Sequence, residues 1–193
     1  MDDAVEVRGQ RRLFKGFVSI DEAVLRHRRY DGTWTDPLTR IKVERGDSAA
    51  AIVRNADTGR IILVEQFKYP TLERSGGWIL ETVAGMIDAG ETPEEAIRRE
   101  VMEEIGYETA SLSHVATFYV SPGALSERIF LYSAEVAEAG RVAAGGGVAA
   151  EGEDIALREF APEELWEALD GGAIMDAKTI IAAAWLRQRL TSS

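Results

Sequence analysis

The sequence predicts one α+β domain preceded by a short N-terminal strand segment. Its length of 193 residues suits a single domain with at most a small appended piece. Hydrophobic residues make up 46% of the chain, which is enough to bury a full core. Stretches typical of strands and of helices follow one another without regular βα alternation, and this favours an α+β arrangement. We therefore expect a strand segment over 1–45 and the main domain over 46–193.

The first half of the chain is predicted to be mostly strand. Apolar and polar residues alternate unevenly over 13–30 and again over 38–45, which favours strands in both stretches. Two apolar runs, 48–54 and 60–67, flank a short segment rich in turn-forming residues, as in a buried β-hairpin. One further strand is expected over 78–83.

The clearest helix begins after Thr92, whose side chain is a suitable N-terminal cap. Pro93 suits the first helical position, and Glu95 completes a capping box with Thr92. The helix is predicted to run to Ile105. It should end at Gly106, because glycine readily adopts the left-handed conformation that closes a helix.

The second half of the chain mixes strands and helices around one low-complexity segment. That segment is rich in glycine and alanine, must be a loop, and by itself is typical of a flexible linker. The predicted elements are, in order, strands over 112–120 and 128–136, the loop over 139–152, a strand over 154–160, and helices over 162–170 and 176–190.

Composition and charge exclude several classes of function. The formal net charge is −11, and so acidic a chain is a poor general ligand for DNA or RNA, whose phosphates attract basic surfaces. There is no cysteine, and the two histidines, His27 and His114, lie far apart, so disulfides and zinc sites are not expected. No apolar run approaches the roughly 18 residues of a membrane span, and no basic leader segment is visible. We expect a soluble cytoplasmic protein that binds neither nucleic acid nor membrane.

Three glutamates lie on one side of the predicted helix. Glu100, Glu103 and Glu104 stand at positions i, i+3 and i+4, beside an apolar stripe that should face the core. Like charges at this spacing destabilise a helix by about 0.2–0.5 kcal/mol per pair, and a divalent cation offsets that repulsion. Mg²⁺ prefers carboxylate, water and phosphate oxygens as ligands. Alone, the three acids are more typical of a solvated helix face, but their surroundings favour a metal site.

The surroundings form a longer pattern from Gly85 to Tyr107. The chain follows the spacing G-x5-E-x7-R-E-U-x-E-E-x-G-U, in which the fixed positions are Gly85, Glu91, Arg99, Glu100, Val101, Glu103, Glu104, Gly106 and Tyr107. This spacing matches the Nudix box, with tyrosine at the last position where an aliphatic residue is usual. The chain therefore resembles the Nudix hydrolases. That resemblance implies an α/β/α sandwich with a mixed sheet, and hydrolysis of a nucleoside diphosphate linked to another group.

The resemblance also implies roles for the residues of the box. Glu100 and Glu104 would be the principal ligands of Mg²⁺, for which Mn²⁺ can substitute. Glu103 would be a third ligand or a bridging acid, and the backbone carbonyl of Ala84 would complete the set. Arg99 would assist catalysis by fixing the loop before the helix against the helix itself.

Other parts of the chain resemble particular branches of the family. Pro122 is characteristic of the ADP-ribose pyrophosphatase branch, and the surrounding run 121–128 is similar to that branch as well. The runs 144–148 and 176–179 instead resemble GDP-mannose pyrophosphatase relatives. The resemblance implies hydrolysis of nucleoside diphosphate sugars, with ADP-ribose cleaved to AMP and ribose 5-phosphate as the first expectation. GDP-mannose, or a broad range of nucleotide sugars, is the alternative.

The loop rich in glycine and alanine leads to two acids, Glu151 and Glu153. By resemblance, Glu153 is a further metal ligand or base, and Glu151 is a candidate base. A mobile loop can deliver such a carboxylate once substrate is bound. The alternative is that both are ordinary solvated loop acids.

Four residues outside the box match family positions that contact substrate. Phe17 resembles the residue that stacks on the purine, and Glu127 matches a position near the terminal sugar. Arg40 and Lys68 match positions that meet phosphate or base edges, but the family usually has arginine where Lys68 stands, so a bidentate contact is lost there. The alternatives are ordinary core packing for Phe17, surface charges for Arg40 and Lys68, and a strand-end acid for Glu127.

The N-terminal strands of this branch commonly reach across to a second subunit. The resemblance therefore implies a homodimer with exchanged N-terminal strands, in which Phe17 and Arg40 help to form the site of the other subunit. A nucleotide sugar is the small-molecule partner that this arrangement implies.

Two other functions are weighed against hydrolysis of nucleotide sugars. Some Nudix-fold domains bind nucleotides as regulators without cleaving them, but these typically lose acids from the box, and every acid is present here. A hydrolase of nucleoside triphosphates or RNA caps is disfavoured by Pro122 and by the acidic charge.

Overall fold

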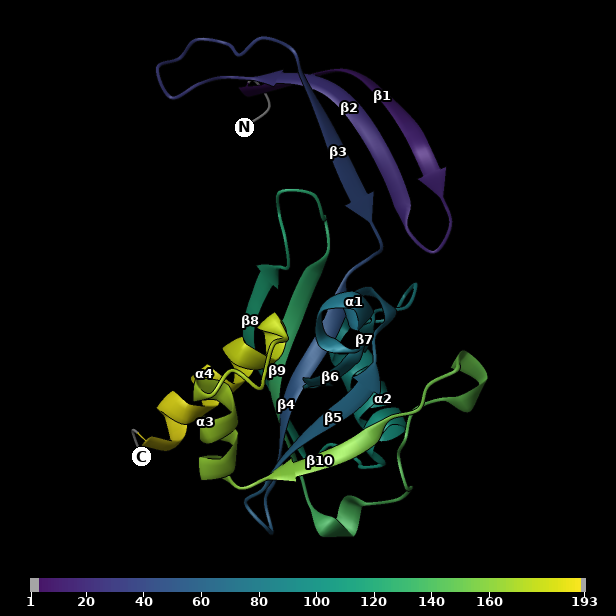
Figure 1. Ribbon diagram of the computed structural model, residues 1–193, viewed down its shortest axis with the longest axis vertical. Coiled ribbons are helices and arrows are strands. Elements are labelled where there is room, and N and C mark those ends of the chain that lie inside the picture. Colours follow the sequence, from purple (N-terminus) through teal and green to yellow (C-terminus); the bar gives the residue numbers. More distant parts are fainter. Residues whose placement is uncertain (1–3, 192–193) are drawn as a thin grey trace. The chain divides into compact units, whose positions relative to one another are not determined.

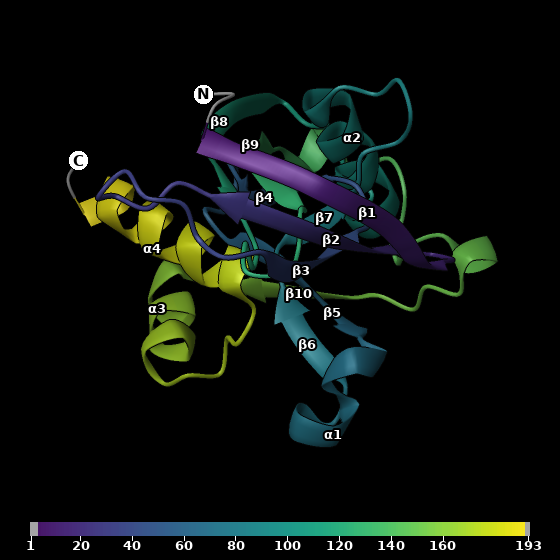
Figure 2. The same cartoon turned by 90° about the horizontal axis from the view of Figure 1, so that it is seen from above.

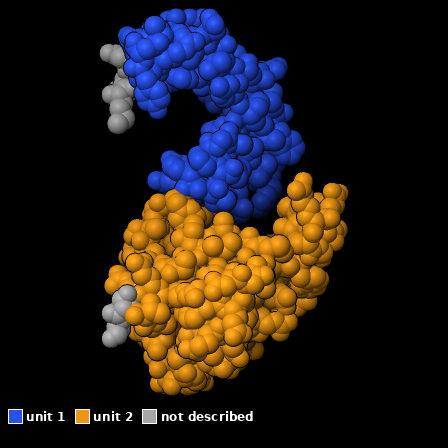
Figure 3. All heavy atoms as spheres, turned by 60° about the vertical axis from the view of Figure 1, so that its left-hand side comes forward, with its two compact units in different colours: residues 1–47, 119–128 blue, residues 48–118, 129–193 orange. Residues whose placement is uncertain are grey.

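The computed structural model describes residues 4–191 and divides the chain into two compact units. One unit combines residues 1–47 with 119–128, and the other combines 48–118 with 129–193 (Figure 3). The boundary between 1–45 and 46–193 that the sequence suggests stays a prediction.

The N-terminal sheet consists of three antiparallel strands in the order β1-β2-β3 (Figures 1 and 2). They are β1 (Val5–Lys15), β2 (Ser19–His27) and β3 (Leu38–Glu44). β1 begins well before the predicted strand region, because its first half is held by charges across the strands. Arg26 forms an ion pair with Glu6 at 2.6 Å, and Arg11 pairs with Glu22 at 2.7 Å. The alternation of apolar and polar residues covers only Val5 to Arg8 and is followed by Gly9 and three polar residues, too short a pattern to predict this part of β1.

The larger sheet has seven strands and is mixed, as predicted. Its order is β10-β5-β4-β9-β8, with β6 paired to β5 and β7 paired to β4. β4 runs parallel to β9 and antiparallel to β5 and β7. The strands are β4 (Ser48–Asn55), β5 (Ile61–Phe67), β6 (Trp78–Glu81), β7 (Val83–Met86), β8 (Ser111–Tyr119), β9 (Arg128–Val136) and β10 (Ala156–Phe160).

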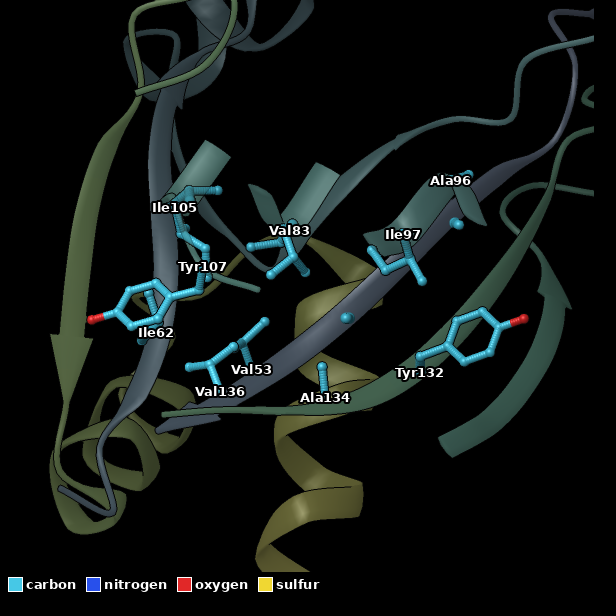
Figure 4. Packing of buried hydrophobic residues seen from close by; sticks show 14 of the residues in the cluster. Val53, Ile62, Val83, Ala96, Ile97, Ile105, Tyr107, Tyr132, Ala134 and Val136 are labelled. Carbon is cyan, nitrogen blue, oxygen red and sulfur yellow. The ribbon is translucent and has the colours of Figure 1, made fainter. Parts of the chain in front are cut away.

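Alternate residues of the central strand β4 pack against opposite layers, as the pleat of a strand requires. Ala51 and Val53 belong to one core cluster together with Ile97 of helix α2 (Pro93–Glu100). Figure 4 shows Val53, Val83 and Ile97 within this cluster.

Their neighbours on β4 point to the other layer. Ile52 belongs to a second cluster with Leu165 of α3 (Pro162–Asp170) and Ala183 of α4 (Ala177–Thr191). Helices therefore cover both faces of the sheet (Figures 1 and 4), and the predicted α/β/α sandwich is confirmed.

Two segments differ from the predicted elements. The single strand expected over 78–83 is two short strands, β6 and β7, because the chain changes its sheet partner from β5 to β4 around Thr82. The N–H of Thr82 donates to the hydroxyl of Thr179 at 2.8 Å instead of to a strand. A 3₁₀ turn (Tyr69–Thr71) and the short helix α1 (Leu72–Ser75) were not predicted. In the described part of the chain, no helix is long and apolar enough to span a bilayer.

Candidate metal centre

The helix that carries the three glutamates changes its hydrogen-bond pattern where they lie. It begins as predicted: the hydroxyl of Thr92 accepts from the N–H of Glu95, and the Glu95 carboxylate accepts from the N–H of Thr92 at 2.8 Å. From Val101 to Ile105 the chain is π-helical, and it ends at Gly106 with φ of 78°. Single π-helical turns are frequent at functional sites. Here the turn sets the positions of Glu103 and Glu104 relative to Glu100.

Glu104 is the most deeply buried acid of the helix, with 1% of its surface exposed. Its carboxylate accepts from the backbone N–H of Ala84 at 3.2 Å and from the amide of Gln66 at 3.5 Å, both neutral donors. Burial raises the pKa of Glu104 well above its usual value, and the charges of Glu100 and Glu81 raise it further. The charge of Lys68 opposes this rise only in part, so the protein itself does not fully neutralise a carboxylate in this position.

Glu100 lies directly against the backbone at Gly85. A Cβ added to Gly85 would stand 1.7 Å from a carboxylate oxygen of Glu100, so any side chain at residue 85 displaces that carboxylate. Burial raises the pKa of Glu100, and the charges of Glu103 and Glu153 add to the rise, while Arg99 opposes it. The first glycine of the box is thus required by the close approach of the helix acid.

Arg99 joins the loop before the helix to the acids on the helix. Its guanidinium donates to both carboxylate oxygens of Glu91 at 3.0 Å and to the carbonyl of Met86 at 3.0 Å. The same group donates to Glu100 at 2.7 Å and to Glu103 at 3.1 Å. The hydrogen bonds from Arg99 hold the pKa of Glu91 below its usual value. The planar fork of arginine provides these several donors at once, which lysine does not.

The loop acid Glu153 comes from a segment far along the chain from the glutamate helix. Its carboxylate accepts from the N–H of Val148 at 2.8 Å, and its charge acts on Glu100, as the raised pKa of Glu100 indicates. The side chain of Glu151 lies outside the described part of the structure. Glu100 and Glu104 thus lie against the Ala84–Gly85 backbone, while the carboxylate of Glu153 is held by the N–H of Val148.

The chemistry of these acids fits a hard divalent cation. Glu100 and Glu104 are like charges buried near each other, and an ion removes the cost of that arrangement. Among residues 4–191, no three acidic, histidine or cysteine side chains already form a metal cage. An ion here therefore needs further oxygen ligands from water, a backbone carbonyl or phosphate, which is the coordination that Mg²⁺ favours.

Lys68, which is partly exposed, belongs to a charge cluster around the buried Glu81. Its ammonium lies 3.0 Å from a carboxylate oxygen of Glu81, and the ammonium of Lys178 binds the other oxygen of Glu81. Lys178 also lies 3.0 Å from Asp176. Burial lowers the pKa of Lys178, but Glu81 and Asp176 outweigh burial, so the pKa lies above its usual value. The lysine at residue 68 is thus held in place next to the acids.

The other three residues singled out for substrate contact lie in the N-terminal unit. The Phe17 side chain is 79% exposed, and the Arg45 guanidinium lies 5.8 Å from the centre of its ring. Arg45 also forms an ion pair with the buried Glu127 at 3.7 Å. Arg40 is exposed, and its side chain donates to the carbonyl of Thr39 at 2.9 Å. Phe17 and Glu127 are thus linked through Arg45.

Sequence reasoning did not assign site roles to Arg45, Glu81 or Lys178. Lys178 stands in the run 176–179, and the runs 44–46 and 81–87, which contain Arg45 and Glu81, also resemble family sequences, so a weak signal was present for all three. The contact between Glu81 and Lys178 gave no signal, because it joins residues 97 positions apart.

Comparison with known proteins gives consistent matches. A family model described as "NUDIX domain" matches residues 44–182. The ADP-ribose pyrophosphatase of Escherichia coli is 34% identical over 184 residues, which cover 95% of this chain and 88% of that protein. The ADP-ribose pyrophosphatase of Haemophilus influenzae is 31% identical over 188 residues, covering 95% and 86%. The GDP-mannose pyrophosphatase of Pectobacterium atrosepticum is 39% identical over 140 residues, covering 72% and 71%.

One solved structure supports the fold. A crystal structure of an ADP compounds hydrolase matches with a TM-score of 0.75 and covers 98% of this chain and 95% of that chain. At 16% identity, this likeness concerns the arrangement of the elements alone.

Proposed function

Because this chain belongs to the NUDIX family, we propose that it hydrolyses the pyrophosphate bond of nucleoside diphosphate sugars, and that it cleaves ADP-ribose to AMP and ribose 5-phosphate. The observation that carries the proposal is the pair of buried glutamates, Glu100 and Glu104, against the Ala84–Gly85 backbone. The relatives named ADP-ribose pyrophosphatase match 95% of the chain, which favours ADP-ribose. GDP-mannose is the second candidate, because the relative that acts on it is 39% identical over its narrower match.

The proposed cofactor is Mg²⁺, with Mn²⁺ as a substitute. Glu100, Glu104 and Glu153 would hold it with the carbonyl of Ala84, and Glu103 would be a third helix acid in reach. A bound divalent cation supplies stabilisation of charge on phosphate oxygens and a more acidic water.

The remaining chemistry falls to side chains of this chain. A loop glutamate, Glu151 or Glu153, accepts the proton of the attacking water. Arg99 keeps Glu100 and Glu103 oriented through its hydrogen bonds to both. Lys68, held by Glu81, contributes a positive charge for substrate phosphate.

Substrate recognition is proposed for the N-terminal unit. Phe17 offers an exposed ring for stacking on the base, and Glu127 offers a carboxylate for sugar hydroxyls. Arg40, whose side chain is exposed, would contact phosphate.

The substrate is tested by a panel of ADP-ribose, GDP-mannose, other nucleotide sugars, dinucleoside polyphosphates and nucleoside triphosphates, each with Mg²⁺ or Mn²⁺. We expect the highest kcat/KM for ADP-ribose, release of AMP, and loss of turnover when EDTA removes the metal. Chromatography of the products measures this directly. Faster phosphate release from triphosphates than AMP release from ADP-ribose would overturn the assignment.

A homodimer with exchanged N-terminal strands is also proposed. It is supported by apolar side chains that the single chain leaves exposed on the N-terminal sheet, among them Val5, Val7 and Phe14. Light scattering should give a mass near twice the 21.2 kDa of one chain. If the strands are exchanged, mixing the Phe17→Ala and Glu104→Gln proteins restores activity above that of either, because one site in each mixed dimer is intact. A monomeric mass contradicts the dimer, and a mixture without recovery contradicts the exchange.

A further inference from the structure

Three successive glycines, Gly145 to Gly147, form a backbone link to the end of the glutamate helix. We call these three residues the glycine clasp. The N–H of Gly146 donates to the carbonyl of Glu104 at 2.9 Å, and the N–H of Gly147 donates to the carbonyl of Glu103 at 3.0 Å. The last carbonyls of a helix have no partner within the helix, so the clasp satisfies two of them.

The other side of the glycine clasp is tied to the segment that carries Glu153. The carbonyl of Gly146 accepts from the N–H of Ile155 at 3.2 Å. Immediately after the clasp, the N–H of Val148 donates to the Glu153 carboxylate at 2.8 Å. The segment of Glu153 is thereby held at two points, at the Glu153 carboxylate and at the backbone of Ile155.

The geometry of the clasp permits only glycine. All three residues have positive φ, at 73°, 107° and 81°. A Cβ at Gly145 would lie 2.6 Å from the carbonyl oxygen of Glu104, which is backbone and cannot move aside. A Cβ at Gly147 would lie 2.6 Å from a carboxylate oxygen of Glu153 and 2.8 Å from its Cβ. The absence of side chains is what lets the loop reach both the helix and Glu153.

We propose that the glycine clasp is a positioning element that fixes Glu153 relative to the helix that carries Glu100 and Glu104, an inference that rests on the proposed function. The carbonyls that hold the clasp belong to Glu103 and Glu104, whose carboxylates are candidate metal ligands. One short backbone link therefore joins the helix acids to the loop acid. The composition of this loop is typical of a flexible linker, but at Gly146 and Gly147 the loop is hydrogen-bonded to the helix.

The test compares Gly147→Ala with Gly172→Ala. Both glycines have similar positive φ, 81° and 76°, so both substitutions strain the backbone alike. A Cβ at Gly172 meets nothing within 4 Å, whereas a Cβ at Gly147 meets Glu153. That Cβ would also lie 2.9 Å from Cδ1 of Ile155, so the difference between the two variants separates the contacts with Glu153 and Ile155 from the strain, and the double variant with Glu153→Gln identifies the share of Glu153.

For Gly147→Ala relative to Gly172→Ala, we expect kcat for ADP-ribose to fall by about 10–100-fold, with KM changed by less than about threefold. Mn²⁺ affinity of the substrate-free protein, measured by electron paramagnetic resonance, should weaken by about tenfold. Adding Glu153→Gln to Gly147→Ala should lower kcat little further, because both changes remove the same positioned carboxylate. The proposal is overturned if Gly147→Ala and Gly172→Ala have the same kcat and the same Mn²⁺ affinity. It is also overturned if the fold-losses in kcat of Gly147→Ala and Glu153→Gln multiply in the double variant.

A measurement on the unaltered protein covers the case in which Gly147→Ala does not fold. Hydrogen exchange of the substrate-free protein should show the amides of Gly146 and Gly147 protected. If both amides exchange as fast as amides in an unstructured loop, the proposed glycine clasp is contradicted. If the unaltered protein cleaves no nucleotide sugar, the proposed function fails, while Mn²⁺ affinity and amide protection still decide the clasp.

Discussion

Replacing Glu104 by glutamine is expected to lower kcat/KM for nucleotide-sugar hydrolysis by about a thousandfold. Glutamine keeps the size of the side chain but removes the negative charge that would hold a divalent cation. Loss of about 4 kcal/mol of metal-based stabilisation of the transition state corresponds to that factor. Steady-state kinetics with ADP-ribose over a range of Mg²⁺ concentrations measures it. Glu94→Gln, an exposed acid on the same helix, is the matched control and should retain activity.

The same variant should leave the fold of the metal-free protein at least as stable. The two carboxylate oxygens of Glu104 accept from the N–H of Ala84 and from the amide of Gln66. The single carbonyl oxygen of a glutamine keeps the contact with Ala84, and the amide of Gln66 can reverse so that its oxygen accepts from the new NH2 group. Burial opposes the charge at this residue, so its removal relieves a cost. Urea unfolding in EDTA tests this. Full Mg²⁺-dependent turnover by Glu104→Gln would contradict the proposed metal site. A large fall in its free energy of unfolding would show that Glu104 has a structural role.

Replacing Lys178 by methionine is expected to destabilise the protein by about 3 kcal/mol. The Lys178 side chain is 13% exposed and forms ion pairs with Glu81 and Asp176. Its removal leaves two carboxylates in a buried place with fewer positive partners, although Lys68 still contacts Glu81. The urea midpoint should fall by about 1 M, given an m value of about 2–3 kcal/mol/M for a chain of this size.

A matched control and a double variant separate this buried pair from other effects. Lys15→Met removes an exposed lysine and should change stability by less than about 0.5 kcal/mol. Adding Glu81→Gln to Lys178→Met should cost less than the two single changes summed, because each removes the partner of the other. If Lys178→Met and Lys15→Met unfold at the same urea concentration, the charge cluster of Lys178, Glu81 and Asp176 does not stabilise the fold as predicted.

Local signals made the glutamate helix predictable. The start is marked by Thr92, Pro93 and Glu95, and the end by Gly106. Each of these signals depends only on residues within one helical turn of it. The π-helical turn was not predictable, because it depends on each N–H reaching the carbonyl five residues back instead of four, and no residue type in Val101–Ile105 signals that choice.

Long-range contacts explain the rest of what sequence could not give. The sequence indicated that Glu100, Glu104 and Glu153 act together only by resemblance, since the loop acid follows far along the chain. The glycine run was typical of a linker, and its docking depends on carbonyls of Glu103 and Glu104 some forty residues earlier. The strand break at Thr82 likewise depends on a hydroxyl 97 residues away. Roles for Phe17, Arg40 and Glu127 stay predictions.

The hydrogen bond between Thr82 and Thr179 bears on the order in which a new chain is completed. Thr82 directly precedes β7, the strand that contains Ala84 and Gly85, and its buried N–H is satisfied by a hydroxyl from the last helix. During synthesis, the whole segment from Gly85 to Tyr107 is made long before Thr179 exists. A chain that stops short of α4 therefore carries every acid of the box and an unsatisfied amide two residues from Ala84. The backbone beside the proposed metal site is therefore complete only after the last helix has been synthesised.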